Sequence, residues 1–376
     1  MVTISKGLDS IYVDENDICF IDGATGRLLY AGFDITDLAA KSSFEETIFI
    51  LWNRRLPKRQ ELADMRQQLG EHRNIPKEIL ELMEGLPTTA HPMDMLRTAV
   101  SALAAYDPEW HQNTPDANMR KAFRLTAKFP TITAAYHRIR QGLAIVRPDP
   151  ARGIADDFLR MLLGRDPDEL STKIMDVCLI LHAEHAMNAS TFSALVTAST
   201  LSDLYSAITS AIGTLKGPLH GGANEEVMKM LLEIRSPEKA PEYVLNQLKA
   251  GKKLSGFGHR VYKAYDPRAT ILKQYALRLS QAKGDLSLFD TAEEVERVML
   301  AQLAEKRIYP NVDFYSGIVY HLMGIPHDLF TPIFAVSRIS GWTAHVLKYW
   351  QDNRLLRPLD LYTGPTSAEY VPLDKR

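Results

Sequence analysis

The sequence has little of what would place a protein outside the cytoplasm or in a membrane. It contains only two cysteines, Cys19 and Cys178, each among apolar residues, which predicts buried thiols in a reducing compartment. No apolar run approaches the ~18 residues of a membrane-spanning helix. The first residues, 1–11, lack the apolar core of a secretory signal. We therefore expect a cytoplasmic protein that does not insert into a membrane.

A strong charge of either sign is also missing. The net charge is -2 and the isoelectric point is near 6.6, so no overall field attracts nucleic acid or a membrane surface. No repeat, low-complexity tract or long polar linker interrupts the 376 residues, a length that allows one large or two medium domains. Any anion-binding site must therefore come from local clusters of Lys and Arg.

Strand signals are confined to the N-terminal region. Residues 18–21 and 28–30 flank the glycine-bearing loop 22–26, a pattern that predicts a β-hairpin. Helical signals dominate the rest of the chain, beginning with a capping box at Ser43 and Glu46. Further helices are expected near 61–71, 92–105, 117–140, 154–163 and 171–187. The predicted fold class is mainly α, with a short N-terminal β-hairpin.

Two short regions resemble hinges, at 216–224 and 324–326, and they bracket about a hundred residues. We therefore expect a smaller helical domain inserted into a larger one. The predicted limits are 1–221 for the first segment of the large domain, 222–322 for the small mobile domain, and 323–376 for the second segment.

Small side chains fill the stretch 189–217, which lets a helix approach its neighbours closely. Such a helix is either a central core helix or part of a large oligomer interface, and periodicity does not separate the two.

A turn around His220 combines unusual backbone with an ionisable side chain. Gly217, Pro218, Gly221 and Gly222 prevent regular helix and leave His220 on a tight turn. A helix is expected to begin near the N-cap residue Asn224, and the field of its N-terminus favours a neutral imidazole. The alternative is an interdomain turn whose histidine faces solvent.

Other segments also carry candidate site residues. His182 and His185 share a helical face, where two histidines in the core are the alternative to zinc ligation. No complete metal-ligand set accompanies them, so no metal is predicted. Asp313 precedes a helical run, where it can act as a helix cap. Arg338 and Arg357 are suited to bidentate carboxylate binding, with surface salt bridges as the alternative.

The last segment, residues 252–268, is rich in glycine and positive charge. Gly256 and Gly258 allow close backbone approach, with Phe257 between them. This combination suits a phosphate-rich or carboxylate-rich ligand, although a solvated basic loop is the commoner explanation. The basic residues are Lys252, Lys253, Arg260, Lys263 and Arg268.

Together these segments resemble citrate synthase over almost the whole chain. The matching motifs are Lys216-Gly-Pro-Leu-His-Gly-Gly222, Gly256-Phe-Gly-His-Arg-Val-Tyr-Lys263, Asp266-Pro-Arg268 and Pro310-Asn-Val-Asp313, in this order. The length is similar to that of the shorter, dimeric archaeal and bacterial type. The sequence departs from the family pattern at Ala31, Phe33 and Ala186-Met187, and the last of these positions bears on acyl or keto-acid selectivity.

The resemblance implies condensation of acetyl-CoA with oxaloacetate, followed by hydrolysis to citrate and CoA. It implies that Asp313 is the base, that His220 stabilises the thioester enol, and that His259 polarises the oxaloacetate carbonyl. It further implies that His185, Arg268 and Arg338 bind the oxaloacetate carboxylates, together with Arg357 contributed in trans within a homodimer. CoA is expected at Lys252, Gly256, Phe257, Gly258, Arg260 and Lys263, and no cofactor is expected beyond the CoA thioester substrate.

Elementary chemistry agrees with these roles. A methyl group beside a thioester is a very weak acid and an ordinary Asp is a weak base, with a pKa of ~3.9. Burial must therefore raise the pKa of the base, and the enolate oxygen must be stabilised. The main competing prediction is 2-methylcitrate synthase, which uses propionyl-CoA. A helical scaffold or an acyl-CoA-binding protein without catalysis, and a histidine-based metalloprotein, are further alternatives.

Overall fold

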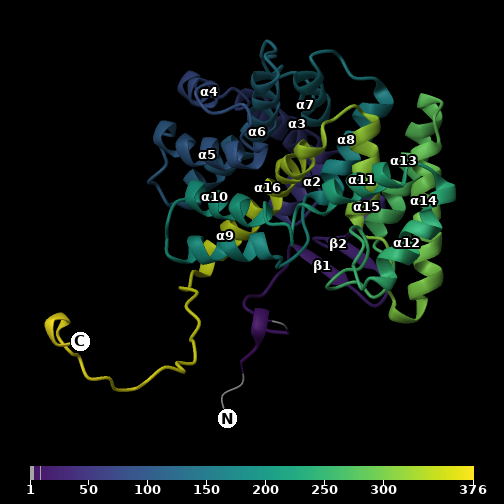
Figure 1. The fold of residues 1–376 in the computed structure, drawn as a ribbon. Helices are drawn as coiled ribbons and strands as arrows, with labels where there is room; N and C mark the ends of the chain where they lie inside the picture. The colour runs from purple at the N-terminus through teal and green to yellow at the C-terminus, as the bar shows by residue number, and fades with distance from the viewer. Residues whose placement is uncertain (1–3, 9) are drawn as a thin grey trace.

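The computed structural model of the protein describes residues 4–8 and 10–376 (Figure 1). Within these residues the chain forms sixteen α-helices and one three-stranded sheet, so the predicted fold class is confirmed. The first eight helices are α1 (Ile35–Lys41), α2 (Phe44–Asn53), α3 (Arg59–Glu71), α4 (Lys77–Glu84), α5 (Pro92–Leu103), α6 (Pro115–Arg140), α7 (Ile154–Leu163) and α8 (Glu169–His182). The others are α9 (Ala189–Ser199), α10 (Leu204–Leu215), α11 (Ala223–Ile234), α12 (Ala240–Lys249), α13 (Pro267–Lys283), α14 (Ser287–Leu303), α15 (Val312–Leu322) and α16 (Phe330–Tyr349).

The sheet contains the predicted hairpin and one further strand. Strands β1 (Cys19–Asp22) and β2 (Arg27–Tyr30) pair antiparallel across the glycine-bearing turn. A third strand, β3 (Phe33–Asp34), pairs with β2. With two residues it is too short to show a period-2 pattern, which explains why only a hairpin was expected.

The hairpin turn packs on the loop that carries His259. The backbone N–H of Lys263 donates to the carbonyl of Gly23 over 2.8 Å. A Cβ atom on Gly23 would lie 2.2 Å from the carbonyl oxygen of Val261, so this contact requires glycine. The sheet therefore braces a loop more than two hundred residues further along the chain.

Helix α16 lies at the centre of the larger group of helices and packs against α2, α6, α8, α9 and α10 (Figure 1). It is buried on all faces, and its hydroxyl side chains bond to backbone carbonyls, as Thr343 does to Ile339 over 2.8 Å. This arrangement places Arg338 in the interior, where an isolated charge needs partners. In the described part of the chain, no helix is both long and apolar enough to cross a membrane.

The stretch 189–217 forms two helices rather than one. Helix α9 ends at Ser199, and Leu201 takes a left-handed conformation with a φ of 61°. The Asp203 side chain then caps α10 by accepting the backbone N–H of Ser206 over 3.0 Å. The two helices pack on each other, so the small residues serve close approach between α9 and α10.

Candidate active site

The turn that carries His220 connects α10 to α11. A Cβ atom on Gly221 would lie 2.5 Å from the carbonyl oxygen of Leu215, so only glycine allows the backbone to approach Leu215 this closely in the turn. Helix α11 begins at Ala223 with Gly222 as its N-cap, so the expected cap at Asn224 was wrong by two positions. Asn224 lies in the first turn instead and is buried.

The imidazole of His220 meets the N-terminus of a different helix, α9. Its Nε2 atom lies 2.8 Å from the Ser190 hydroxyl and 3.4 Å from the Ser190 backbone nitrogen. The hydroxyl of Ser190 also accepts the indole N–H of Trp342 over 3.1 Å. Burial and the positive charge of Arg338 lower the pKa of His220 to about 4, so the ring is neutral near pH 7.

These contacts decide which nitrogen of His220 carries the proton. The backbone N–H of Ser190 can only donate, so it favours Nε2 as an acceptor. The Ser190 hydroxyl accepts from Trp342 and has one proton, which it can donate either to this atom or to Oδ1 of Asn188, each 2.8 Å away. On the backbone contact we assign the proton to Nδ1, which is available to donate to a ligand.

The second imidazole, His259, is held as the opposite tautomer. Its Nδ1 atom accepts the backbone N–H groups of Val261 (3.0 Å) and Tyr262 (3.2 Å). Nδ1 is therefore unprotonated and Nε2 carries the proton. Burial and the Arg268 charge lower the pKa of His259 to about 4, so this ring is also a neutral donor.

His185 lies next to His259 and Tyr262. Its ring centre is 4.9 Å from that of His259, and its Nε2 atom is 3.3 Å from the hydroxyl of Tyr262. Burial lowers the pKa of His185, and the charges of Arg268 and Arg338 lower it further. Its neighbour in sequence, Ala186, has a φ of 51°, a strained conformation for a residue other than glycine.

Asp313 is buried in the first turn of α15. The N-cap of this helix is Asn311, whose side chain accepts the Asp313 backbone N–H over 3.0 Å, so the expected capping role of Asp313 was wrong. The Asp313 Oδ1 atom is buried without a hydrogen-bond partner in the part of the chain that the structure describes. Burial raises the pKa of Asp313 to about 7, which makes the ionised carboxylate a stronger base than an ordinary Asp.

The segment before His259 and the segment before Asp313 are joined by backbone hydrogen bonds. Asn311 donates to the carbonyl of Gly256 over 2.9 Å, and Gly258 donates to the carbonyl of Tyr309 over 2.8 Å. Both glycines have φ above 80°, and a Cβ on Gly256 would lie 2.8 Å from the Phe314 ring. These glycines therefore fix His259 relative to Asp313.

The predicted arginines have three different environments. Arg268 forms a buried bidentate pair with Asp266, over 3.0 and 2.8 Å. Arg338 donates to the carbonyl of His182 over 2.7 Å and lies 4.6 Å from the centre of the Phe334 ring. Arg357 is exposed in the C-terminal segment, which extends away from the helices (Figure 1). The chain thus assembles all the predicted catalytic and oxaloacetate-binding residues except Arg357.

The residues predicted to bind CoA lie on the same loop as His259. Their four basic side chains are exposed, and none takes part in an ion pair within the described residues. Phe257 is partly buried, with its ring 4.7 Å from that of Phe314. The basic side chains are Lys252, Lys253, Arg260 and Lys263.

Sequence reasoning missed several polar residues of the site. Asp266 holds Arg268 and also accepts the backbone N–H of Val312 over 3.2 Å. Its position before Pro267, at a helix start, was a usable signal. Ser190 and Tyr262 gave no comparable signal, because each is defined by a contact with a distant histidine. Residues 4–8 and 10–376 contain no group of three or more His, Cys, Asp or Glu side chains placed to hold a metal ion.

A buried base, two neutral imidazole donors and two buried guanidiniums define an enzyme that performs general acid–base chemistry on a small anion. Residues 7–359 match the family described as citrate synthase, C-terminal domain. Citrate synthase 2 of Bacillus subtilis is 48% identical, with all of both chains covered. 2-Methylcitrate synthase 2 of Corynebacterium glutamicum is 39% identical, with 99% of this chain and 98% of the relative covered.

The fold gives the same result. A Thermoplasma acidophilum citrate synthase, solved as a ternary complex with carboxymethyl coenzyme A and oxaloacetate, has a TM-score of 0.95 at 36% identity, with 100% of both chains covered. The chain belongs to the citrate synthase family. This membership confirms the prediction of an acyltransferase with citrate synthase activity.

Proposed function

We propose that the chain condenses acetyl-CoA with oxaloacetate through Asp313, His220 and His259. Asp313 removes a proton from the acetyl methyl group, and Nδ1–H of His220 donates to the thioester oxygen as it gains negative charge. The new carbon–carbon bond forms at the oxaloacetate ketone, whose oxygen receives the hydrogen bond from Nε2–H of His259. Water then cleaves the thioester, giving citrate, CoA and a proton.

The observation that supports this proposal best is the buried, unpartnered carboxylate oxygen of Asp313. A buried carboxylate without a partner is costly for a fold, so its retention indicates a role with substrate. The test is release of free thiol from acetyl-CoA with and without oxaloacetate. Thiol release that requires oxaloacetate supports the proposal, and release independent of oxaloacetate, or none, contradicts it.

Oxaloacetate is assigned to His185, Arg268 and Arg338. The two arginines are buried, and a dianion in a closed pocket needs such cations. CoA phosphates are assigned to the exposed basic residues of the loop, Lys252, Lys253, Arg260 and Lys263, and the close backbone approach to Gly256, Phe257 and Gly258. Replacing Lys263 by Ala is expected to raise the KM for acetyl-CoA and leave the KM for oxaloacetate unchanged.

A second candidate is the use of propionyl-CoA, which gives 2-methylcitrate. It is favoured by the relative from Corynebacterium glutamicum and by Ala186, whose small side chain follows His185. One methylene in an apolar pocket is worth only ~1–3 kcal/mol, so both acyl groups can be used. We expect acetyl-CoA to be preferred, and kcat/KM for the two thioesters at equal oxaloacetate measures this.

We further propose a homodimer in which the partner subunit's Arg357 completes each site. Arg357 lies on an exposed C-terminal segment that leaves the helical body and carries exposed Leu359, Tyr370 and Leu373 (Figure 1). Exposed apolar side chains on an extended segment suit contact with another surface. The partly exposed faces of α9 and α10 supply small side chains for packing against a second copy.

Co-expression of His220→Ala with Arg357→Ala tests the shared site. If Arg357 acts in trans, one site of a mixed dimer has both residues intact, and activity returns to up to about half the sites. Purified mixed dimers with no more turnover than either parent would contradict the proposal.

We also propose that residues 1–221 and 323–376 form a large domain and residues 222–322 a small mobile one. Helices α11 to α15 group on one side of the molecule (Figure 1). The segments that flank them contain the tight turn 216–222 and Gly324, whose φ is 80°. We expect residues 222–322 to rotate over bound oxaloacetate and exclude water. Crystal structures with and without oxaloacetate that superpose over both parts would count against this motion.

We also propose that the protein is cytoplasmic. Cys19 and Cys178 are buried free thiols, and burial raises the pKa of Cys178 to about 12. Thiols held in this form suit a reducing compartment.

A further inference from the structure

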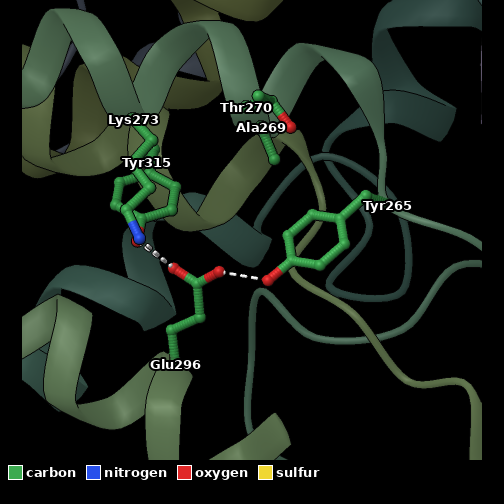
Figure 2. Close-up of a pocket in the computed structure, with 6 residues that line it drawn as sticks. All are labelled: Tyr265, Ala269, Thr270, Lys273, Glu296 and Tyr315. Carbon is green, nitrogen blue, oxygen red and sulfur yellow. Dashed lines mark hydrogen bonds and ion pairs between the residues drawn. The ribbon is translucent and has the colours of Figure 1, made fainter. Parts of the chain in front are cut away.

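The carboxylate of Glu296 connects three segments that lead to the site residues. Figure 2 shows Glu296 on α14 pointing toward Tyr265, Tyr315 and Lys273. Its Oε1 atom accepts the hydroxyl of Tyr265 over 2.5 Å. Its Oε2 atom accepts the hydroxyl of Tyr315 and the ammonium of Lys273, the latter over 3.0 Å. Glu296 is 4% exposed and Tyr315 is buried, whereas Tyr265 and Lys273 are partly exposed.

Each partner of Glu296 lies close in sequence to a residue with a proposed role. Tyr265 directly precedes Asp266, which holds Arg268 and the backbone of α15. Tyr315 lies two positions after Asp313 on the same helix. Lys273 lies five positions after Arg268 on α13. Glu296 therefore contacts the loop before α13, α13 itself and α15.

The contacts around Tyr265 extend this connection to His259. The Tyr265 ring lies 4.9 Å from the ring of Tyr309, whose carbonyl accepts the backbone N–H of Gly258. The Tyr265 backbone also lies against Gly26 of the hairpin turn, where a Cβ would approach its carbonyl oxygen to 2.4 Å. A shift of Tyr265 therefore moves the segment that sets the position of His259.

We propose that Glu296 is a positioning residue that fixes the segment carrying His259 and Arg268 relative to the helix carrying Asp313. It touches no substrate in this proposal and acts only through Tyr265, Tyr315 and Lys273. The inference rests on the proposed function, because it assigns Glu296 to the same site. It predicts that loss of each contact disturbs a different step.

The two tyrosine contacts are tested separately by Tyr265→Phe and Tyr315→Phe. Removing the Tyr265 hydroxyl frees the segment that binds oxaloacetate, so the dissociation constant and KM for oxaloacetate are expected to rise about threefold to tenfold. Removing the Tyr315 hydroxyl frees the first turn of α15, so kcat is expected to fall about threefold to tenfold, with a shift in the midpoint of the pH–rate profile. Glu296→Gln keeps one acceptor oxygen and is expected to produce at least one of these effects, because its amide nitrogen cannot accept the hydroxyl proton of the other tyrosine.

The matched control is Glu293→Gln. Glu293 also pairs with Lys273 over 3.0 Å, but it is about half exposed and, among the described residues, has no hydrogen bond to either tyrosine. We expect its kinetic constants to stay within about twofold of those of the unaltered protein, since exposed ion pairs contribute little. The comparison therefore separates the buried connection from the loss of one negative charge near Lys273.

The measurements are steady-state thiol release from pH 6 to 8.5, oxaloacetate binding by calorimetry, and thermal unfolding. Kinetic and binding constants of Glu296→Gln and both tyrosine variants within twofold of the unaltered protein, with only a lower Tm, would overturn the inference and leave a structural role. If Glu296→Gln does not fold, the two tyrosine variants decide. Absence of thiol release by the unaltered protein would reject the proposed function instead, and calorimetry would still report whether Tyr265→Phe weakens oxaloacetate binding.

Discussion

The two buried arginines of the site show how differently its two halves are built. Arg268, in the half formed by the 256–268 loop, α13 and α15, is already paired with Asp266. Arg338, in the half formed by α8, α9 and α16, contacts a backbone carbonyl and the Phe334 ring. The paired charge raises the pKa of Arg268, whereas burial lowers that of Arg338. The α16 half therefore offers a cation without a directly bonded carboxylate, and the other half supplies its own counter-charge.

The two histidines differ in the same way. His259 is held by two backbone N–H groups, which leave only one arrangement of its proton. His220 is held by Ser190, whose hydroxyl can donate or accept and also bonds to Trp342 and Asn188. A backbone anchor fixes a tautomer outright, whereas a side-chain anchor does so only through further contacts. The comparison predicts that side-chain substitutions disturb the His220 anchor more readily than the His259 anchor.

The largest effect is expected from Asp313→Asn. The amide fits the same space but is not a base, so kcat is expected to fall at least ~100-fold in thiol-release assays.

The unaltered protein must ionise a buried carboxylate whose pKa is about 7, and this costs stability above that pH. Because the folded-state pKa exceeds the unfolded value of ~3.9, stability is lost as pH rises between the two values, by up to about 4 kcal/mol.

Asp313→Asn should therefore gain stability relative to the unaltered protein between pH 5 and pH 8, measured by denaturant unfolding. Near-normal turnover would reject the base, whereas a stability difference that is independent of pH would reject the raised pKa.

The next effect compares the two arginines directly. Arg338→Gln removes a cation that has no bonded carboxylate, so the Kd for oxaloacetate is expected to rise ~10–100-fold with little loss of Tm. Arg268→Gln leaves the buried Asp266 without its ion-pair partner. It is expected to lose ~3–5 kcal/mol of stability as well as oxaloacetate binding. Calorimetry and thermal unfolding of both variants check this contrast. Equal losses of stability would show that the two environments do not differ as described.

A smaller effect is expected from pH. Asp313 must be ionised to act as a base, so kcat/KM for acetyl-CoA should fall about tenfold from pH 8 to pH 6. Both histidines stay neutral in this range, because their pKa values are about 4. The profile should therefore have a single acid limb with a midpoint near 7. Two overlapping limbs in this range would indicate that His220 or His259 also titrates.

The smallest effect is expected from Ser190→Ala. It removes the hydroxyl that Trp342 and His220 share, so kcat should fall about twofold to tenfold while the oxaloacetate KM stays unchanged. The control is Ser171→Ala, which removes a hydroxyl bonded to a cap residue, Asp168, in the first turn of α8. A Ser190→Ala variant that matches this control in kcat would show that the His220 anchor does not depend on the hydroxyl.

The sequence by itself determined the helical class, the hairpin and helix α7, predicted as 154–163 and found at Ile154–Leu163. These elements follow from local periodicity and turn residues, which act within a few positions. Glycine- and proline-rich turns marked the segments of His220, His259 and Asp313, and the resemblance to citrate synthase predicted the roles of these residues. The wrong predictions were local too: both expected caps, Asn224 and Asp313, lay two positions past the true ones.

Only the tertiary structure decided how these residues can act. The proton of His220 depends on contacts with Ser190, thirty positions away in sequence. The charge of Arg268 is already paired with Asp266, and no motif shows this pairing. Glu296 gave no local signal, because its importance lies in contacts with three other segments. Burial sets the pKa values of Asp313 and both histidines, and burial is a property of the packed chain rather than of a motif.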